Sequence, residues 1–245
     1  MALDHALAAC SSPGEGVLRI YRWSGPTVSF GRNEPARGRY DPAEAGNAGI
    51  EFVRRPTGGR AVLHDRELTY AAVLPLSKRG LRATYALINR GLVRGLRSLG
   101  VPATMAEGHG LQARLDSGPC FDEPSTGEVT VAGRKLVGSA QARIEGAILQ
   151  HGSLLIAPGQ ERLLGLDPTS GEVSQGKGST SQTPTCLEEV LGQAPPWIDL
   201  VDAVVSGVKG VTEGDWHRGE LTEAERVKSV ALTEQYASAE WTWRR

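Results

Sequence analysis

Cysteine is scarce in this sequence, and the few cysteines present are far apart. The 245-residue chain has three, Cys10, Cys120 and Cys186, an odd number without a Cys-x-x-Cys pair. A disulfide-stabilised scaffold and a cysteine zinc cluster both need paired or closely spaced cysteines, so this spacing argues against each of them. The cysteine content is typical of a reducing compartment, and we expect a cytoplasmic location and no bound metal.

An excess of one charge and long apolar runs are also missing. Lysine and arginine number 27, and aspartate and glutamate number 28, which leaves a formal net charge of −1. Because no global basic field exists, we expect no nucleic-acid partner and no membrane partner. No apolar stretch approaches the roughly 20 residues of a membrane span, and the acid and histidine near the start do not fit a secretory signal.

The remaining composition is that of a globular chain with a buried core. Hydrophobic residues make up 40% and charged residues 22% of the sequence, which are ordinary values for globular proteins. Single cores stop growing at about 250 to 300 residues, so this length fits one domain. We therefore predict a single domain over residues 1–245.

The spacing of apolar residues predicts strands in the first two thirds and helices near the end. Between residues 81 and 99 they recur every three or four positions, the period of a helix with one buried face. The other predicted helices cover 2–9, 185–192, 197–209 and 221–236, and the predicted strands cover 17–23, 27–30, 51–55, 67–74, 128–131, 135–144 and 147–156. We expect an α+β fold with a mixed, largely antiparallel sheet flanked by helices, and long loops at 101–127 and 167–184.

Residues that could bind a ligand or catalyse a reaction are most concentrated in the segment 54–65, which reads Arg-Arg-Pro-Thr-Gly-Gly-Arg-Ala-Val-Leu-His-Asp. The adjacent Gly58 and Gly59 let the backbone turn sharply and present amide groups to a carbonyl or phosphate, while the three arginines can hold anions. An ordinary hairpin turn with solvated arginines is the alternative. His64, taken alone, is more typical of a hydrogen-bonded structural histidine than of a catalytic base.

A second motif, Gly-Arg-Lys-Leu-Val-Gly-Ser-Ala-Gln, covers residues 133–141. If Lys135 starts the strand, Val137 and Ser139 share its face, and Gly138 lies on the other face. The small residues allow a close approach to the sheet, whereas composition alone favours a plain surface lysine.

A third motif, Leu-Gln-His-Gly-Ser, covers residues 149–153. Its polar pair followed by glycine, inside an apolar strand, indicates either a bulge or a close ligand.

These motifs, in this order, resemble the octanoyltransferase and lipoate-protein ligase family of the biotin/lipoate protein ligase superfamily. The resemblance extends from Met-Ala-Leu-Asp at 1–4 to Tyr-Ala-Ser-Ala-Glu-Trp at 236–241. It implies that the sheet and the Gly-Gly loop form a tunnel for an eight-carbon acyl or lipoyl chain, and that the motif lysine contacts the reacting acyl group. The substrate-binding residues it implies are Arg55, Thr57, Gly58, Gly59, Arg60, His64, Gly138, Ser139, Ala140, His151 and Gly152.

The segment Cys-Phe-Asp-Glu-Pro-Ser at 120–125 bears on how the acyl group is activated. It resembles the signature of the cysteine-dependent octanoyl-[acyl-carrier-protein]:protein N-octanoyltransferase subgroup, which implies Cys120 and Lys135 as catalytic residues. A thiolate attacks thioesters well and leaves well when an amine attacks, so one cysteine serves both halves of a transfer. An inert buried cysteine is the alternative reading of Cys120.

The resemblance implies an octanoyltransferase of lipoate biosynthesis that forms a thioester intermediate and needs no cofactor. Acyl carrier protein would be the octanoyl donor, and lipoyl-domain proteins such as glycine cleavage H protein or the 2-oxoacid dehydrogenase E2 subunit would be acceptors. The alternatives are an ATP- and Mg-dependent lipoate-protein ligase, octanoyl transfer from glycine cleavage H protein, and an inactive acyl-binding module. Against family members, we expect a slightly shortened N-terminus and no C-terminal ligase accessory domain.

Overall fold

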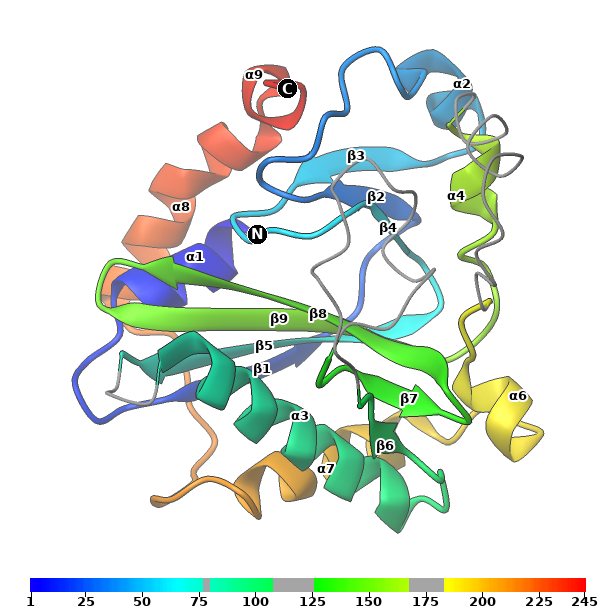
Figure 1. Ribbon diagram of the computed structural model, residues 1–245. Helices are drawn as coiled ribbons and strands as arrows, with labels where there is room; N and C mark the ends of the chain where they lie inside the picture. The colour runs from blue at the N-terminus through cyan, green and yellow to red at the C-terminus, as the bar shows by residue number, and fades with distance from the viewer. Residues whose placement is uncertain (77–79, 108–125, 168–182) are drawn as a thin grey trace.

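A six-stranded antiparallel sheet forms the centre of the protein in the computed structural model, which describes residues 1–76, 80–107, 126–167 and 183–245 (Figure 1). In spatial order its strands are β1 (Val17–Tyr21), β5 (Glu67–Pro75), β9 (Ala147–Leu155), β8 (Arg134–Ile144), β7 (Val129–Val131) and β6 (Thr104–Met105). The long hairpin of β8 and β9 lies in the middle of this sheet. It carries the second and third sequence motifs side by side.

A smaller, three-stranded sheet covers part of one face of the main sheet. It has the order β3 (Glu51–Arg54), β2 (Thr27–Phe30) and β4 (Val62–His64). Strands β2 and β3 are parallel, and β2 and β4 are antiparallel. The Gly-Gly loop connects β3 with β4 and therefore lies at the end of this sheet, next to the N-terminus (Figure 1).

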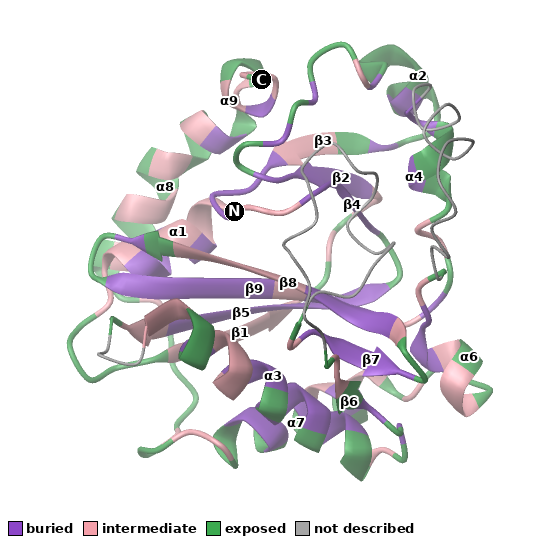
Figure 2. Cartoon of the chain, viewed as in Figure 1, coloured by how far each residue is buried: buried purple, intermediate pink, exposed green. Residues whose placement is uncertain are grey.

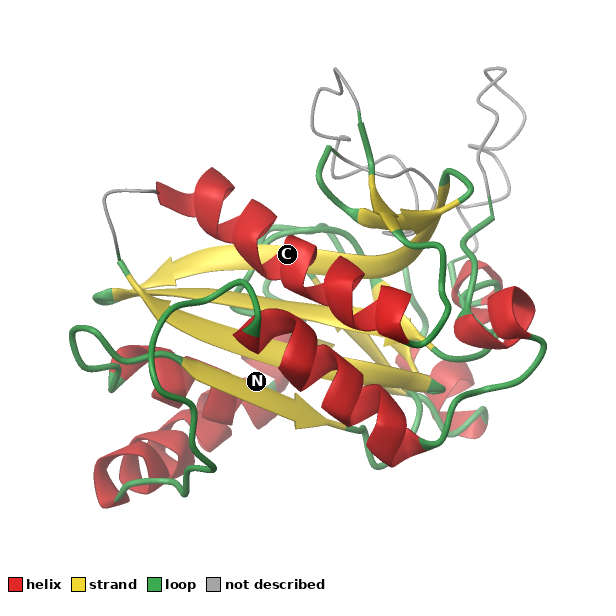
Figure 3. Ribbon diagram, turned by 90° about the horizontal axis from the view of Figure 1, so that it is seen from below, coloured by secondary structure: helices red, strands yellow, loops and turns green. Residues whose placement is uncertain are grey.

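The helices are distributed over both faces of the main sheet (Figures 1 and 3). They are α1 (Ala2–Ala9), α2 (Pro42–Asn47), α3 (Gly80–Ser98), α4 (Arg162–Gly165), α6 (Leu187–Leu191), α7 (Trp197–Lys209), α8 (Glu223–Ala237) and α9 (Ala239–Thr242). Helices α3 and α7 cover one face, and α1 and α8 lie on the other face beside the small sheet.

The central strands are buried along most of their length (Figure 2). Their side chains alternate between two clusters, one on each face of the sheet. On β5, Tyr70 and Ala72 pack in the cluster that contains Leu92 of α3 and Val204 of α7. The intervening Ala71 and Val73 pack in a separate cluster with α1. Because both faces are covered, β5 and β9 are buried almost throughout, unlike a half-exposed strand.

A tight turn and a bulge shape the start of β8. Ala132 and Gly133 have φ values of 50° and 79°, the left-handed conformation that a two-residue type I′ hairpin requires at both positions. The pairing with β7 then shifts: Val129 pairs with Val137, but Thr130 pairs with Lys135. Leu136 is therefore an extra residue, and such a bulge changes which side chains share a face.

The predicted fold class is confirmed: the architecture is α+β, with a largely antiparallel sheet flanked by helices. The predicted elements occur with boundaries that differ by a few residues. The sequence pattern missed the short elements β4, β6, α2, α4 and α9, and did not separate β2 and β3 from the main sheet. The predicted loop at 167–184 lies mostly outside the described residues, as does most of the loop at 101–127. Within the described ranges, no helix is long and apolar enough to span a bilayer.

Helices α3 and α7 approach each other closely because glycines lie where they cross. A Cβ atom added to Gly95 would lie 2.2 Å from the carbonyl oxygen of Ala203, and one added to Gly207 would lie 2.2 Å from that of Gly91. Any larger side chain at these positions forces the helices apart.

We predict that Gly95→Ala lowers the free energy of unfolding by about 1–3 kcal/mol, as overpacking a core does. Helix propensity alone favours alanine by roughly 0.5–1 kcal/mol, so the steric effect must outweigh it. Chemical denaturation measures the change. Gly46→Ala in α2 is the matched control, since no described atom lies within 4 Å of its added Cβ. A Gly95→Ala protein as stable as Gly46→Ala would contradict the prediction.

Candidate active site

A cavity lies between the main sheet and the small sheet. A cross-strand row of Tyr21, Thr69, Ser153 and Gly138 runs along its floor on four adjacent strands. From the small sheet and the Gly-Gly loop, Val62, His64 and Arg55 form the opposite wall. Seven of the predicted substrate-binding residues line this cavity: Arg55, His64, Gly138, Ser139, Ala140, His151 and Gly152.

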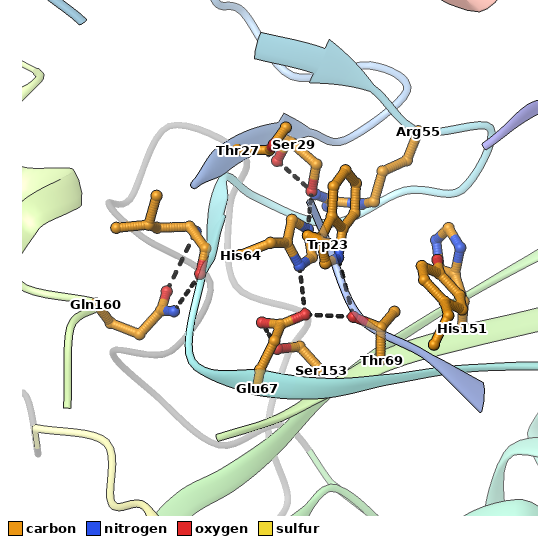
Figure 4. Close-up of polar contacts among 12 residues, drawn as sticks. Trp23, Thr27, Ser29, Arg55, His64, Glu67, Thr69, His151, Ser153 and Gln160 are labelled. Carbon is orange, nitrogen blue, oxygen red and sulfur yellow. Dashed lines mark hydrogen bonds and ion pairs between the residues drawn. The ribbon is translucent and has the colours of Figure 1, made fainter. Parts of the chain in front are cut away.

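His64 is held on both ring nitrogens (Figure 4). Its Nε2 shares a hydrogen bond of 2.6 Å with Ser29 Oγ, and its Nδ1 lies 2.7 Å from Glu67 Oε1. The indole ring of Trp23 stacks on the imidazole at 4.3 Å between centroids, and its N–H donates to Thr69 Oγ1. His64 is therefore a fixed wall residue, as its sequence context suggested, and not a base with an open nitrogen.

The Glu67 carboxylate connects the two walls of the cavity. Besides contacting His64 on the small sheet, it accepts hydrogen bonds from the hydroxyl groups of Thr69 and Ser153 on the main sheet (Figure 4). Its side chain is buried. Glu67 was not singled out from the sequence, although its position three residues after the motif histidine on the following strand was a usable signal.

Arg55 shapes the Gly-Gly loop from inside. Its Nη1 donates to the backbone oxygen and Oγ of Ser29, and its Nη2 donates to the carbonyl oxygens of Gly58 and Arg60. Gly59 has a φ of 93°, the left-handed region that favours glycine. The loop is thus not a simple hairpin turn with solvated arginines, because a buried guanidinium organises it.

The expectation that the three motif arginines hold anions is wrong for Arg54. Its buried guanidinium donates to the carbonyl oxygens of Gly31, Glu34 and Thr242. Carbonyl oxygens, rather than a ligand anion, satisfy most of its donors. Arg55 is engaged in the same way, and Arg60 is also buried.

Glu34 supports the Gly-Gly loop from the other side. Its carboxylate accepts hydrogen bonds from the backbone N–H groups of Gly31 and Ala61, at 3.0 and 2.8 Å. Burial raises the pKa of Glu34, although the positive charge of Arg55 and the two backbone donors oppose this. Gly31 has to be glycine here, because a Cβ atom would lie 1.8 Å from the carbonyl oxygen of Gly59.

His151 closes a second buried network at the other end of the cavity. Its Nε2 shares a hydrogen bond of 2.5 Å with Thr57 Oγ1, and its Nδ1 lies 3.7 Å from Asp4 Oδ2. Arg19 and Tyr21 also donate to the Asp4 carboxylate. Burial by itself raises the pKa of Asp4, but His151, the N-terminal ammonium and Arg19 outweigh it and lower that pKa well below its usual range.

Gly152 continues a regular ladder, so the bulge predicted as one option at this motif is wrong. Residues on both sides of it pair in unbroken register with β5 and β8. A Cβ atom here would lie 2.6 to 2.8 Å from Gly138, Tyr70 and Ser139. The glycine leaves room for the hydrogen bond of 2.7 Å between the hydroxyl groups of Tyr70 and Ser139.

Lys135 is not the surface lysine that composition favours. Its side chain is buried, and its ammonium donates to Glu128 Oε1 at 2.8 Å. Nor does it share a face with Val137 and Ser139, as strict alternation predicts, because the extra residue in the bulge reverses its side. It does not occur among the described residues lining the cavity, although it lies three positions before Gly138 on the same strand.

Cys120 lies outside the described residues, as does the rest of its motif, so its catalytic role stays a prediction. Of the other two cysteines, Cys186 is buried and Cys10 is partly buried. Among the residues that the structure describes, no three histidine, cysteine, aspartate or glutamate side chains gather as a metal site needs.

Comparison with known proteins shows to which family the chain belongs. The model of the lipoyl protein ligase A/B catalytic domain matches residues 1–209. The chain belongs to this family. Two members similar to it over its full length are octanoyltransferases LipM, from Kyrpidia tusciae at 38% identity and from Moorella thermoacetica at 37%, of which the match covers 94% and 93%.

Solved structures of lipoate protein ligases share the fold. Lipoate-protein ligase A bound with ATP superposes with a TM-score of 0.80 at 22% identity, over 99% of this chain and 92% of the other. A bi-partite ligase from Thermoplasma acidophilum gives 0.80 at 23% identity, over 99% and 89%. At these identities the likeness establishes the architecture of the lipoyl protein ligase family and no finer property.

We predict that Glu67→Gln lowers the free energy of unfolding by about 1–3 kcal/mol, since an amide N–H₂ would replace an acceptor among three donors. Denaturant titration measures the effect. Glu188→Gln is the matched control: Glu188 pairs with Arg66 on the surface, where such pairs contribute about 0–1 kcal/mol. Equal losses in both variants would contradict the bridging role of Glu67.

We predict that the fold becomes less stable as the pH falls from 7.5 to 5.5, and that His151 accounts for part of the loss. Burial lowers the pKa of His151 below its ordinary 6.5, despite the opposing Asp4. Below pH 6.5 the unfolded chain therefore binds a proton that the folded chain refuses, at up to about 1.4 kcal/mol per pH unit.

His5 contributes in the same pH range, since burial also lowers its pKa. The comparison is therefore between the wild type and His151→Gln, each unfolded with guanidinium at both pH values. The variant should lose less stability on acidification. If His151→Gln lost as much free energy of unfolding as the wild type between the two pH values, the prediction would be contradicted.

Proposed function

We propose that this protein transfers an octanoyl group from octanoyl-acyl carrier protein, through an acyl-cysteine intermediate, to the target lysine of lipoyl domains. The observation that carries the proposal is the set of relatives named octanoyltransferase LipM, of which one matches the whole chain at 38% identity. The ligase from Thermoplasma acidophilum described with its E2 lipoyl domain supports lipoyl domains as acceptors. Glycine cleavage H protein and 2-oxoacid dehydrogenase E2 subunits carry such domains.

In the first step, the thiolate of Cys120 attacks the thioester carbonyl carbon. A new carbon–sulfur bond forms, the bond to the carrier's pantetheine sulfur breaks, and that thiolate leaves and takes up a proton. In the second step, the target lysine amine attacks the acyl-cysteine and forms an amide. Cys120 leaves as a thiolate, and the amine releases one proton. Neither step consumes ATP or needs a metal.

The predicted site residues have separate roles in this reaction. Lys135 provides a positive charge that stabilises the oxyanion developing on the carbonyl in both steps. Arg55, Gly58, Gly59 and Arg60, with Thr57 and His64, hold the wall above the acyl chain. Gly138, Ser139, Ala140, His151 and Gly152 form the side of the main sheet, where the small side chains leave space for an alkyl chain.

We predict that the purified protein mixed with octanoyl-acyl carrier protein gains one octanoyl group, detected by intact mass spectrometry. Hydroxylamine should remove the group, because it cleaves thioesters. Cys120→Ala should lack the adduct and lose transfer to a lipoyl domain, whereas Cys10→Ala should keep both.

The same experiment separates the alternatives. Modification of the lipoyl domain only with free octanoate, ATP and Mg would establish a ligase and overturn the transfer. An adduct from octanoylated glycine cleavage H protein, without one from the carrier protein, would retain the chemistry but replace the donor. Octanoyl binding without modification of any acceptor would indicate an inactive acyl-binding module.

A further inference from the structure

The buried ion pair between Lys135 and Glu128 lies at the bulged end of β8. The exposed fraction of Lys135 is 2% and that of Glu128 is 4%. Their Nζ and Oε1 atoms are 2.8 Å apart. Removing an ammonium from water is unfavourable, so burial requires a partner with the opposite charge. Glu128 lies directly before β7, outside every sequence motif that predicted the site.

The bulge determines the face on which this pair lies. Val129 and Val137 pair with each other and both pack against α3 and α7. Thr130 follows Val129 and therefore points to the opposite face, as does its partner Lys135. Lys135 consequently shares a face with Gly138, which follows Val137 and lines the cavity. Without the extra residue, the lysine would point into the apolar core.

The backbone at the start of β8 is also held by the segment that contains residues 184–189. The carbonyl oxygen of Lys135 accepts a hydrogen bond from the N–H of Thr185, and the guanidinium of Arg134 binds the carbonyl oxygen of Pro184 and the carboxylate of Glu189. With the strand held on both sides, the remaining freedom is in the long lysine side chain. Glu128 restricts that freedom at the charged end.

We propose that Glu128 is a positioning residue for acyl transfer, which holds the Lys135 ammonium on the cavity face where the acyl carbonyl reacts. This inference rests on the proposed function, since it assumes that Lys135 stabilises the oxyanion. A displacement of about 1 Å at a reacting centre reduces rates on the order of a hundredfold. Glu128 therefore affects the rate of transfer through Lys135, without touching the substrate.

Glu128→Gln tests the proposal, because it keeps the shape and an oxygen acceptor but removes the charge. We expect kcat for octanoyl transfer to fall about 10- to 100-fold, with KM for the octanoyl carrier protein within about twofold of the wild type. Glu128→Asp keeps the charge on a shorter side chain and should recover part of the rate. In a Lys135→Met background, Glu128→Gln should cause no further loss, since residues that act through one another are not additive.

Asp167→Asn is the matched control. Asp167 is also a buried carboxylate in an ion pair, with Arg39, but neither residue lines the cavity. This variant should keep the wild-type kcat even if its melting temperature falls. An equal loss of kcat in Asp167→Asn and Glu128→Gln would show a general effect of breaking buried pairs and would overturn the positioning role.

A spectroscopic measurement covers the case in which Glu128→Gln does not fold. The carbonyl stretch of a ¹³C-labelled octanoyl-enzyme reports how strongly a positive charge polarises that bond. In Glu128→Asp the band should move to higher frequency and broaden relative to the wild type. An identical band, or an unchanged kcat in Glu128→Gln, would overturn this inference alone. A wild type that forms no octanoyl adduct would instead overturn the proposed function.

Discussion

Hydrogen bonds between buried polar side chains connect the two sheets and fix the distance between them. A purely apolar interface between the sheets would close by packing, because protein interiors are dense. Here Glu67 reaches from the main sheet to His64 on the small sheet, and Thr57 of the Gly-Gly loop reaches down to His151. These fixed-length contacts set the separation of the walls. The cavity and the position of the Gly-Gly loop depend on them.

In each of these networks, the polar groups find nearly all of their hydrogen-bond partners among the members of the network. Glu67 accepts from three side chains, and Asp4 is surrounded by Arg19, Tyr21 and His151. A buried polar network that is fully bonded is rigid, whereas one with missing partners is unfavourable. The acyl chain that we propose to bind between the walls would therefore meet side chains whose orientations are already determined. Such preorganisation reduces the entropy lost on binding.

The sequence was sufficient for the fold class, the long helix α3, the three consecutive strands β7, β8 and β9, and seven residues of the cavity. It failed where the outcome depends on contacts between distant segments. The side on which Lys135 points follows from a bulge against β7, which no local pattern encodes. The burial of Arg54 follows from carbonyl groups supplied by residues far away in the chain. Glu67, Glu34 and Glu128 were missed because an isolated glutamate is normally solvated.

The contacts of Arg54 also have a consequence for how the protein unfolds. Its guanidinium binds the carbonyl oxygen of Thr242 in α9, and the indole of Trp241 donates back to the Arg54 carbonyl oxygen. The last helix is thus fastened to the strand that leads into the Gly-Gly loop. Terminal helices ordinarily fray with little effect on the rest of a protein. Here, opening of α9 removes one carbonyl acceptor from the buried Arg54 guanidinium, so local opening of this helix is coupled to loss of order in β3 and the Gly-Gly loop that follows it.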